Sequence, residues 1–396
     1  MPSTNNQTRY ANGETIIQHR VFLVDIVDKS TKPEILLDRM NELKNLVETY
    51  GGLVILSEYQ KKDLPDPKTY IGKGKLDEII DGMLANDANL LIVGNALKPS
   101  QIYQLNEKLR IISEEKKLPV KMEARDRIDL ILKIFEKHAT SGESRLQIEL
   151  AAIKHMGPRI FRMGLDLSKQ GGSASGGGGG ATRGSGETNT EVMKRHLKEK
   201  VRKIEKKLEE YTRTRSIQRD TRRKRGMTTV GIVGYTNAGK SSLLNALTKK
   251  GVLAENKLFA TLNSNVGNLY VITDPILGTG KEILLNDTIG FIRDLPPKLI
   301  KSFSSTLEDS IESDFLLHVI DASDPYIQDR IDVVNQILAD IGANQKQILV
   351  FNKMDKLNEG KKAEIMSRFD SSDAVFISVK QGDGLVELKD LLVRYA

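Results

Sequence analysis

The segment that most constrains this chain is the loop GYTNAGKS at residues 234–241, which matches the pattern GxxxxGK[ST] in full. The apolar run TTVGIVG leads into it and the amphipathic stretch SSLLNALTKK completes it, so we expect it between a buried strand and a helix. In such a turn the backbone N–H groups and the positive end of the helix face phosphates. The sequence therefore predicts an α/β domain with a nucleotide-binding loop made by Gly234, Tyr235, Thr236, Asn237, Ala238, Gly239, Lys240 and Ser241.

Further residues predict how the phosphates and a Mg²⁺ ion are held. Lys240 would reach the β- and γ-phosphates, and the Ser241 hydroxyl would bind Mg²⁺. The apolar stretch EILLN leads into a DxxG motif, in which the aspartate would hold Mg²⁺ through water and the glycine N–H would contact the γ-phosphate. Loss of that phosphate would release the segment behind it. The motif consists of Asp287, Thr288, Ile289 and Gly290.

A second candidate switch follows the helix of the phosphate loop. Thr261 is the natural second hydroxyl ligand for Mg²⁺ in the triphosphate state, and Lys240 and Thr261 would together stabilise the transferred phosphate. The segment consists of Phe259, Ala260, Thr261, Leu262 and Asn263.

Two segments near the C-terminus indicate which base is bound. The run QILVF ends in the NKxD motif, and an aspartate at the carboxyl end of a strand can accept hydrogen bonds from both N1–H and N2–H₂ of guanine. Adenine lacks that donor pair and would leave the carboxylate unpaired, so the motif favours GTP over ATP. A backbone N–H after the strand AVFI would lie near the guanine O6, although the tripeptide there is equally consistent with an ordinary strand end. The residues are Asn352, Lys353, Met354, Asp355, Ser378, Val379 and Lys380.

One position is informative because of what is missing. Directly after the DxxG glycine, where GTPases of the Ras type have a glutamine that orients the attacking water, this chain has Phe291. A phenyl ring cannot hydrogen-bond water. We therefore assign no catalytic base and expect slow intrinsic hydrolysis that a large partner stimulates.

Composition sets the class of protein and its partners. The chain has 396 residues, enough for two or three domains, and contains no cysteine, which fits a reducing cytoplasm. The N-terminal segment is poor in acids and rich in Ser and Thr but has a single early arginine, so we expect a cytoplasmic location over an organellar one. No apolar run approaches the roughly 18 residues of a membrane span. Residues 227–396 hold 18 Lys+Arg against 22 Asp+Glu, whereas residues 1–226 hold 42 against 31. This asymmetry predicts that the N-terminal part contacts a polyanion such as RNA, unless it is only a solvated, charged helical surface.

The basic part itself has two patterns. Short apolar runs at 21–27, 52–56 and 89–93 alternate with helical spacing in 33–50, 75–84 and 99–109, which predicts a parallel sheet. From about residue 126, apolar residues recur at steps of three and four on both sides of a connector, which predicts an antiparallel helical hairpin. We place the boundaries at 14–122 for the α/β subdomain, 123–225 for the hairpin and 226–396 for the nucleotide-binding domain.

The connector at 157–187 joins basic side chains to a Gly/Ser-rich run. Its composition is that of a flexible linker, but at the tip of a hairpin it would reach into a structured RNA. A second basic run, at 222–225, would contact RNA or serve as a solvated hinge. The candidate RNA contacts are Arg159, Arg162, Lys169, Gln170 and Arg183.

Together these motifs resemble the HflX family of ribosome-associated GTPases. The segments that carry the resemblance are TYIGKGK, LKPSQ, ARDRIDLILKIF, LSKQGG, RGSGET, GYTNAGKSSLLNALT, FATLN, NDTIGFIRDLP and TLED. The resemblance implies an N-terminal α/β subdomain plus hairpin, followed by a Ras-like G domain. It further implies GTP-dependent binding to the large ribosomal subunit and its rRNA. The hairpin loop would reach toward the peptidyl-transferase centre, and stalled or idle ribosomes would be separated into subunits. From the motifs we expect GTP and GDP to bind together with Mg²⁺, and we expect a monomer.

The chain departs from the usual pattern of that family at four places, one of which is an unusually long glycine run in the tip loop. Asn263 stands where the family usually has aspartate, Lys169 stands where it has arginine, and SVK replaces SAK. Lysine does not replace arginine at a stacked or bidentate contact, so the tip contact is expected to be altered. Two other functions remain open: a GTP-dependent factor for ribosome assembly or RNA remodelling, and a regulatory switch that binds a protein partner.

Overall fold

The computed structural model describes residues 9–11, 14–16, 19–171, 189–248, 258–259, 265–274, 279–296, 299 and 311–396. Its contacts divide the chain into two compact units. Unit 1 comprises Met1–Ile134 and Ala152–Lys203, and unit 2 comprises Phe135–Ala151 and Ile204–Ala396. Within the described ranges, every helix is either too short or too polar to cross a bilayer.

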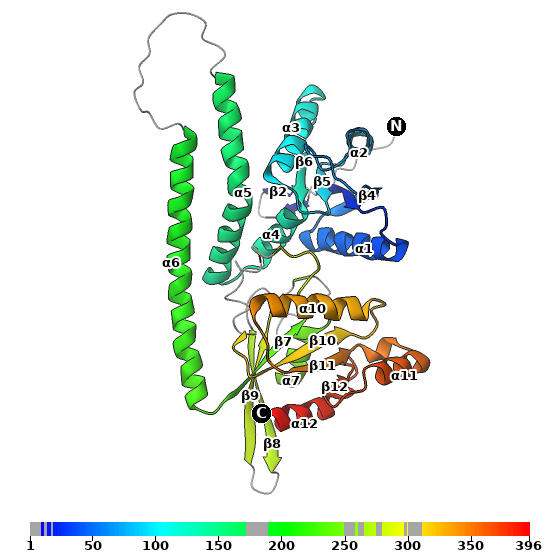
Figure 1. The fold of residues 1–396 in the computed structure, drawn as a ribbon, viewed down its shortest axis with the longest axis vertical. Coiled ribbons are helices and arrows are strands. Elements are labelled where there is room, and N and C mark those ends of the chain that lie inside the picture. The colour runs from blue at the N-terminus through cyan, green and yellow to red at the C-terminus, as the bar shows by residue number, and fades with distance from the viewer. Residues whose placement is uncertain are drawn as a thin grey trace, which may run out of the picture. The chain divides into compact units, whose positions relative to one another are not determined.

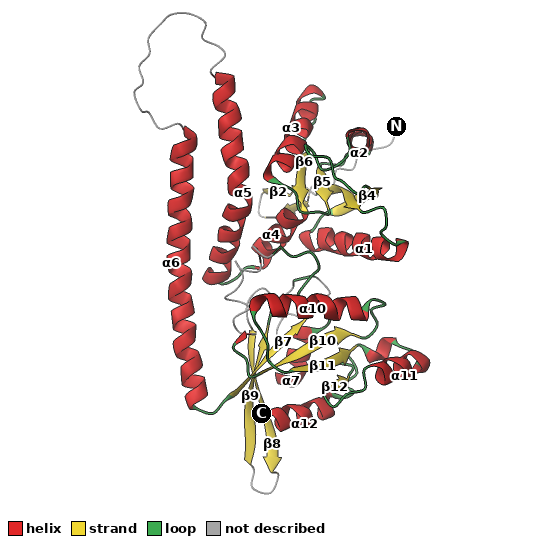
Figure 2. Cartoon of the chain, viewed as in Figure 1, coloured by secondary structure: helices red, strands yellow, loops and turns green. Residues whose placement is uncertain are grey.

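Unit 1 is built on a four-stranded, entirely parallel sheet with the order β4-β3-β5-β6, which confirms the predicted parallel sheet. Helix α1 begins at a proline, whose fixed φ suits a first helical position, and ends at Gly51 in the left-handed region (φ 92°). The elements are β3 (Arg20–Val27), α1 (Pro33–Tyr50), β4 (Leu53–Lys61), α2 (Lys73–Ala85), β5 (Leu90–Val93), α3 (Pro99–Glu115) and β6 (Glu123–Asp126). Figures 1 and 2 show helices on both faces of this sheet.

Three short strands are additional to the prediction. Strands β1 (Arg9–Ala11) and β2 (Glu14–Ile16) form an antiparallel pair, and β6 closes one edge of the sheet of unit 1. They are missed because three or four residues are too few to show a two-residue periodicity. The sequence EARD of β6 is, moreover, mostly polar.

Three helices form the middle of the chain: α4 (Arg127–His138), α5 (Gly142–Gly171) and α6 (Asn189–Lys224). The first turn of α5 is joined to α6 by an ion pair between Glu143 and Arg215. Helix α5 continues to Gly171, so the first half of the predicted 157–187 tip loop is helical, which corrects the loop boundary. The Gly/Ser-rich composition begins only at Gly171, and the residues before it keep helical spacing. Residues 172–188 lie outside the described ranges.

Unit 2 contains a six-stranded sheet with the order β12-β11-β10-β7-β9-β8, in which only β8 runs antiparallel. The strands are β7 (Thr228–Gly234), β8 (Asn265–Asp274), β9 (Thr279–Asp287), β10 (Phe315–Asp321), β11 (Gln347–Asn352) and β12 (Ala374–Phe376). The helices are α7 (Lys240–Thr248), α10 (Ile327–Ile341), α11 (Glu359–Arg368) and α12 (Leu385–Tyr395), with a 3₁₀ turn at Met354–Lys356.

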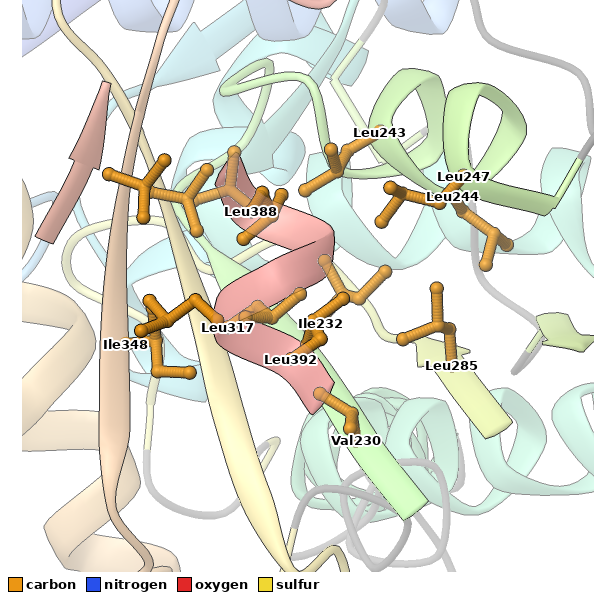
Figure 3. Packing of buried hydrophobic residues seen from close by; sticks show 14 of the residues in the cluster. Val230, Ile232, Leu243, Leu244, Leu247, Leu285, Leu317, Ile348, Leu388 and Leu392 are labelled. Atoms are coloured by element: carbon orange, nitrogen blue, oxygen red, sulfur yellow. The ribbon is translucent and has the colours of Figure 1, made fainter. Parts of the chain in front are cut away.

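Two apolar clusters hold these helices on opposite faces of the sheet. On one face, α7 and α12 pack on alternate residues of β7, β9, β10 and β11, as Figure 3 shows for Leu243, Leu317 and Leu388. On the other face, α10 and α11 cover Ile320 and Phe351. Each fully buried leucine contributes about 1.5–3 kcal/mol relative to an exposed one. The clusters therefore fix the carboxyl ends of β7, β9, β10 and β11, where the predicted motifs lie.

Candidate nucleotide-binding site

The phosphate loop connects the end of β7 to the start of α7, as the sequence predicts. Gly234 has φ 150°, and a Cβ there would lie 2.2 Å from the Val319 carbonyl oxygen. Gly239 has φ 102°, and a Cβ there would lie 2.3 Å from Asn352 Nδ2. Both glycines are therefore required because the loop passes close to the ends of β10 and β11.

Lys240 lies beneath this loop and is buried. Its Nζ donates hydrogen bonds to the carbonyl oxygens of Gly234 (3.2 Å) and Tyr235 (2.9 Å). Burial lowers the pKa of Lys240 to about 8, although the nearby Asp287 carboxylate opposes this effect. The loop thus holds a desolvated ammonium, which suits a polyanionic phosphate.

The predicted Mg²⁺ ligands Ser241 and Asp287 lie together. The Ser241 hydroxyl donates a hydrogen bond of 2.7 Å to Asp287 Oδ2, and the Asp287 side chain is fully buried at the end of β9. A hydroxyl and a carboxylate are the oxygen ligands that Mg²⁺ prefers, so this pair fits the ion. Thr261, the third predicted ligand, lies outside the described residues, as do Ala260, Leu262 and Asn263.

The DxxG segment is attached to the phosphate loop by backbone hydrogen bonds. The Thr236 N–H donates to the Phe291 carbonyl (2.8 Å), and the Phe291 N–H donates to the Gly234 carbonyl (3.1 Å). A Cβ on Gly290 would lie 2.9 Å from Lys240 Nζ, so the glycine and the lysine meet at one point. The Phe291 side chain is 1% exposed. The segment is therefore placed for the predicted γ-phosphate contact.

The predicted base-recognition residues converge on the same loop. Asn352 Nδ2 donates to the Ala238 carbonyl (3.0 Å), and Asn352 Oδ1 accepts a hydrogen bond from the Val379 N–H (3.1 Å). The Ser378 hydroxyl donates to Asp355 Oδ1 at 2.7 Å, which fixes the orientation of that carboxylate. These bonds join the ends of β7, β11 and β12 in one site.

The side chains of some other predicted site residues make contacts inside the fold or face solvent. The Thr288 hydroxyl donates to the Ile232 carbonyl (2.7 Å) inside the fold, and Met354 packs in the apolar cluster under α10 and α11. Ile289 is buried and Lys380 is exposed. Their contact with nucleotide stays a prediction.

Phe259 has a conformation of its own. It is 3% exposed, has φ 57° in the left-handed region, and packs edge-to-face against Phe135 with ring centroids 4.7 Å apart. A bulky residue rarely adopts that φ, so the packing must offset the strain.

Sequence reasoning missed Asp321, which bonds to the predicted residue Lys353. Lys353 Nζ donates to the Asn237 carbonyl (2.7 Å) and to Asp321 Oδ2 (2.6 Å) at the end of β10. Asp321 could have been found, because it follows the apolar run FLLHVI at a strand end.

A second missed contact lies on α10. The Arg330 guanidinium lies 4.5 Å from the centroid of the Tyr235 ring, and its Nε donates to Asp324 (3.0 Å). The Tyr235 hydroxyl in turn accepts a hydrogen bond from the Arg293 N–H (3.0 Å). No local spacing relates Arg330 to the phosphate loop, so only the fold reveals this contact.

The predicted RNA contacts are placed only along the backbone. Arg159, Arg162, Lys169 and Gln170 lie on α5, and Arg183 lies outside the described ranges. Their role stays a prediction.

Comparison with known proteins covers nearly the whole chain. Family models described as GTP-binding GTPase N-terminal, GTP-binding GTPase Middle Region and 50S ribosome-binding GTPase match residues 37–136, 138–222 and 229–353. The chain is 41% identical to the GTPase HflX of Caldanaerobacter subterraneus subsp. tengcongensis over 95% of this chain and 80% of that protein. For the GTPase HflX of Escherichia coli K12, identity is 33% over 96% of this chain and 82% of that protein.

A solved structure supports the same architecture. The crystal structure of SsGBP in complex with GDP superposes with a TM-score of 0.50 and 26% sequence identity. The match covers 95% of this chain and 98% of that one. It therefore extends over both units and not over the nucleotide-binding domain alone.

Proposed function

The chain belongs to the HflX family of GTPases, and from that premise we propose that it binds the large ribosomal subunit in its GTP state and separates stalled or idle ribosomes into subunits. GTP hydrolysis, stimulated by the ribosome, would then release it. Such a protein acts where ribosomes are, in the cytoplasm. The observation that carries the RNA-binding part of this proposal is the charge and exposure of α6.

Helix α6 is a long cationic surface. It contains 14 Lys+Arg against 6 Asp+Glu, and all eight Lys and Arg between positions 194 and 207 are exposed. Among the described residues of this helix, Ile204 is the only buried hydrophobic residue. A polar helix of this kind gains little from an apolar core, whereas each phosphate that it neutralises releases counterions and favours binding to RNA.

The bound nucleotide would determine when the protein binds the ribosome. Lys240 would neutralise the β- and γ-phosphates, while Ser241 and, through water, Asp287 would hold a Mg²⁺ ion that screens the charge of the triphosphate. Thr261 is proposed as the further ligand that is present only with the γ-phosphate. Because Phe291 cannot orient water, the GTP state would persist until the ribosome assists hydrolysis.

Gradient sedimentation tests the proposal. Addition of the protein with a non-hydrolysable GTP analogue should convert whole ribosomes into separate subunits, and addition with GDP should not. Unchanged ribosome peaks at saturating protein would contradict the splitting activity.

The same cationic helix also favours a second function, a GTP-dependent factor that assembles ribosomes or remodels RNA. The two functions differ in the particle that is recognised. A splitting factor acts on mature ribosomes, whereas an assembly factor would bind immature subunits or free rRNA and leave the mature ribosome peak unchanged.

Charge variants test the contribution of α6 to either function. Replacing Lys198, Arg202 and Lys206 by glutamine should weaken binding to large subunits. The slope of log K against log salt concentration should decrease in magnitude by roughly 0.7–0.9 for each lost phosphate contact. The matched control is glutamine at the exposed residues Lys281, Lys361 and Arg394 of unit 2. Equal effects of the two variants would indicate a loss of net charge and not a binding face.

A further inference from the structure

The third residue of the phosphate loop, Thr236, carries a buried hydroxyl that the mechanism described so far does not use. Its side chain is 8% exposed, and its Oγ1 has no hydrogen-bond partner among the described residues. Its backbone N–H is already used by the Phe291 carbonyl. A buried hydroxyl without a partner is unfavourable, and such groups in a native site call for an explanation.

The position of Thr236 supplies that explanation. Its Cγ2 lies 3.0 Å from the point that a Cβ on Gly290 would occupy, and Lys240 Nζ lies 2.9 Å from the same point. Lys240 and Gly290 are the two groups expected at the γ-phosphate. The hydroxyl branches from the same Cβ as Cγ2, so rotation about the Cα–Cβ bond to another staggered rotamer can bring it to the point where Lys240 and Gly290 meet.

The neighbouring residue cannot take this role. Phe291 is held to the phosphate loop through both backbone hydrogen bonds, and its apolar ring is buried. A threonine hydroxyl, in contrast, can donate one hydrogen bond and accept two. It can therefore bond both to a phosphate oxygen and to a water molecule next to that phosphate.

We propose that Thr236 is a positioning residue for GTP hydrolysis, whose hydroxyl donates to a γ-phosphate oxygen and accepts a hydrogen bond from the attacking water. The water oxygen forms the new bond to the γ-phosphorus, and the bond from the γ-phosphorus to the bridging oxygen breaks with its electron pair remaining on GDP. The water proton leaves with inorganic phosphate. Thr236 itself is neither consumed nor deprotonated, and its contribution is orientation.

The central test removes the hydroxyl and keeps the shape. Thr236→Val should lower the single-turnover rate of basal GTP hydrolysis, measured without ribosomes at saturating GTP and Mg²⁺, by about 10- to 100-fold, the effect of one hydrogen bond to a charged group. The GDP dissociation constant should change less than about twofold, since GDP lacks the γ-phosphate. Thr236→Ser should retain the wild-type rate within a few-fold.

A matched control and a second pair of variants exclude a fault in folding. Thr248→Val removes a hydroxyl of α7 that, among the described residues, donates to the Leu244 carbonyl in its own helix, and it should leave the hydrolysis rate unchanged. If Thr236→Val fails to fold, Thr236→Ser and Thr236→Ala, which both lack the methyl group, should differ by the same 10- to 100-fold.

Three results would overturn the inference: wild-type hydrolysis in Thr236→Val, equal rates in the serine and alanine variants, or parallel losses of GTP and GDP affinity. The inference rests on the GTPase activity alone. Because the assay contains no ribosomes, its failure would leave the proposed ribosome splitting untouched, and the reverse also holds.

Discussion

The parallel sheet of unit 1 and the mostly parallel sheet of unit 2 both place polar residues at the carboxyl ends of their strands, but these residues make different contacts. In unit 1, the buried Asp25 of β3 accepts a hydrogen bond from Arg39 Nε (2.8 Å), and Asn95 bonds to both the N–H and the carbonyl of Ile26 at 2.9 Å. Asp126 of β6 accepts hydrogen bonds from the backbone N–H groups of Leu97 and Asp129. These side chains stabilise turns within the unit.

In unit 2, the corresponding groups bond to the phosphate loop and to each other. Asp287 accepts from Ser241, and Asn352 and Lys353 donate to carbonyls of the loop between β7 and α7. These bonds attach the loop to the ends of β9 and β11. The comparison teaches that the carboxyl edge of a parallel sheet offers a place for a ligand, while a glycine-rich loop and its partners decide whether a nucleotide site forms.

Removal of the loop lysine should have the largest effect and should be confined to unit 2. Lys240→Ala is expected to weaken GTP binding by at least about 100-fold, because a buried charge-assisted contact to two phosphates is lost. Fluorescence titration with a labelled GTP measures this loss, and Lys281→Ala on the exposed part of β9 is the control. Retained tight binding would contradict the assignment of the phosphate loop.

The choice of base should depend on one carboxylate. Asp355→Asn is expected to lower GTP affinity by about 100-fold or more, because an amide cannot accept both guanine N–H donors. Xanthosine triphosphate, which presents an acceptor in place of the N2 amine, should bind the variant better than GTP does. Competition titration measures both, and an unchanged preference for guanine would refute the role of Asp355.

The motifs of unit 2 could be predicted from the sequence, whereas the contacts between distant segments could not. GYTNAGKS, DTIG and NKMD are contiguous, and their chemistry depends on spacing along the chain, so the phosphate, Mg²⁺ and guanine contacts could be predicted directly. The contacts between Arg330 and Tyr235 and between Lys353 and Asp321 join distant segments, and only the sheet order brings them together. The Thr236 hydroxyl, which has no partner among the described residues, is likewise visible only once its neighbours are known.

The polar residues of unit 1 should matter for stability and not for nucleotide binding. Arg39→Ala leaves the fully buried Asp25 carboxylate without its guanidinium and is expected to cost about 3–5 kcal/mol of unfolding free energy. Denaturant unfolding followed by circular dichroism measures the cost. If the dissociation constants of GTP and GDP both rose in Arg39→Ala, the functional separation of the two sheets would be wrong.

A smaller effect should appear in the pH dependence of the free energy of unfolding. A rise in pH should destabilise unit 1, whereas a fall in pH should destabilise unit 2. Burial acts to lower the pKa of His155 in unit 1, but hydrogen bonds to Asp126 and Asp129 raise it to about 9. Its stabilisation is therefore complete below about pH 6.5 and is lost as the pH rises through 9. Burial lowers the pKa of His318 in unit 2 to about 4, so stability there falls as the pH drops from about 6.5 toward 4.

Thermal unfolding across pH 4 to 10 separates the two histidines. In the wild type, titration of His155 should cost about 3 kcal/mol of unfolding free energy at alkaline pH. His155→Gln should remove most of this cost and leave the loss of stability at acid pH, the acid limb, unchanged. His318→Gln should reduce the acid limb only. An alkaline limb that persists in His155→Gln would show that the ion pairs of His155 do not stabilise unit 1.

Cosedimentation with separated ribosomal subunits tests the central proposal most directly. The protein should pellet with large subunits in the presence of a non-hydrolysable GTP analogue, remain in the supernatant with GDP or with small subunits, and dissociate as salt is raised. Equal pelleting with GDP and the analogue, or binding that is insensitive to salt, would contradict a GTP-controlled protein that uses a cationic helix to hold ribosomal RNA.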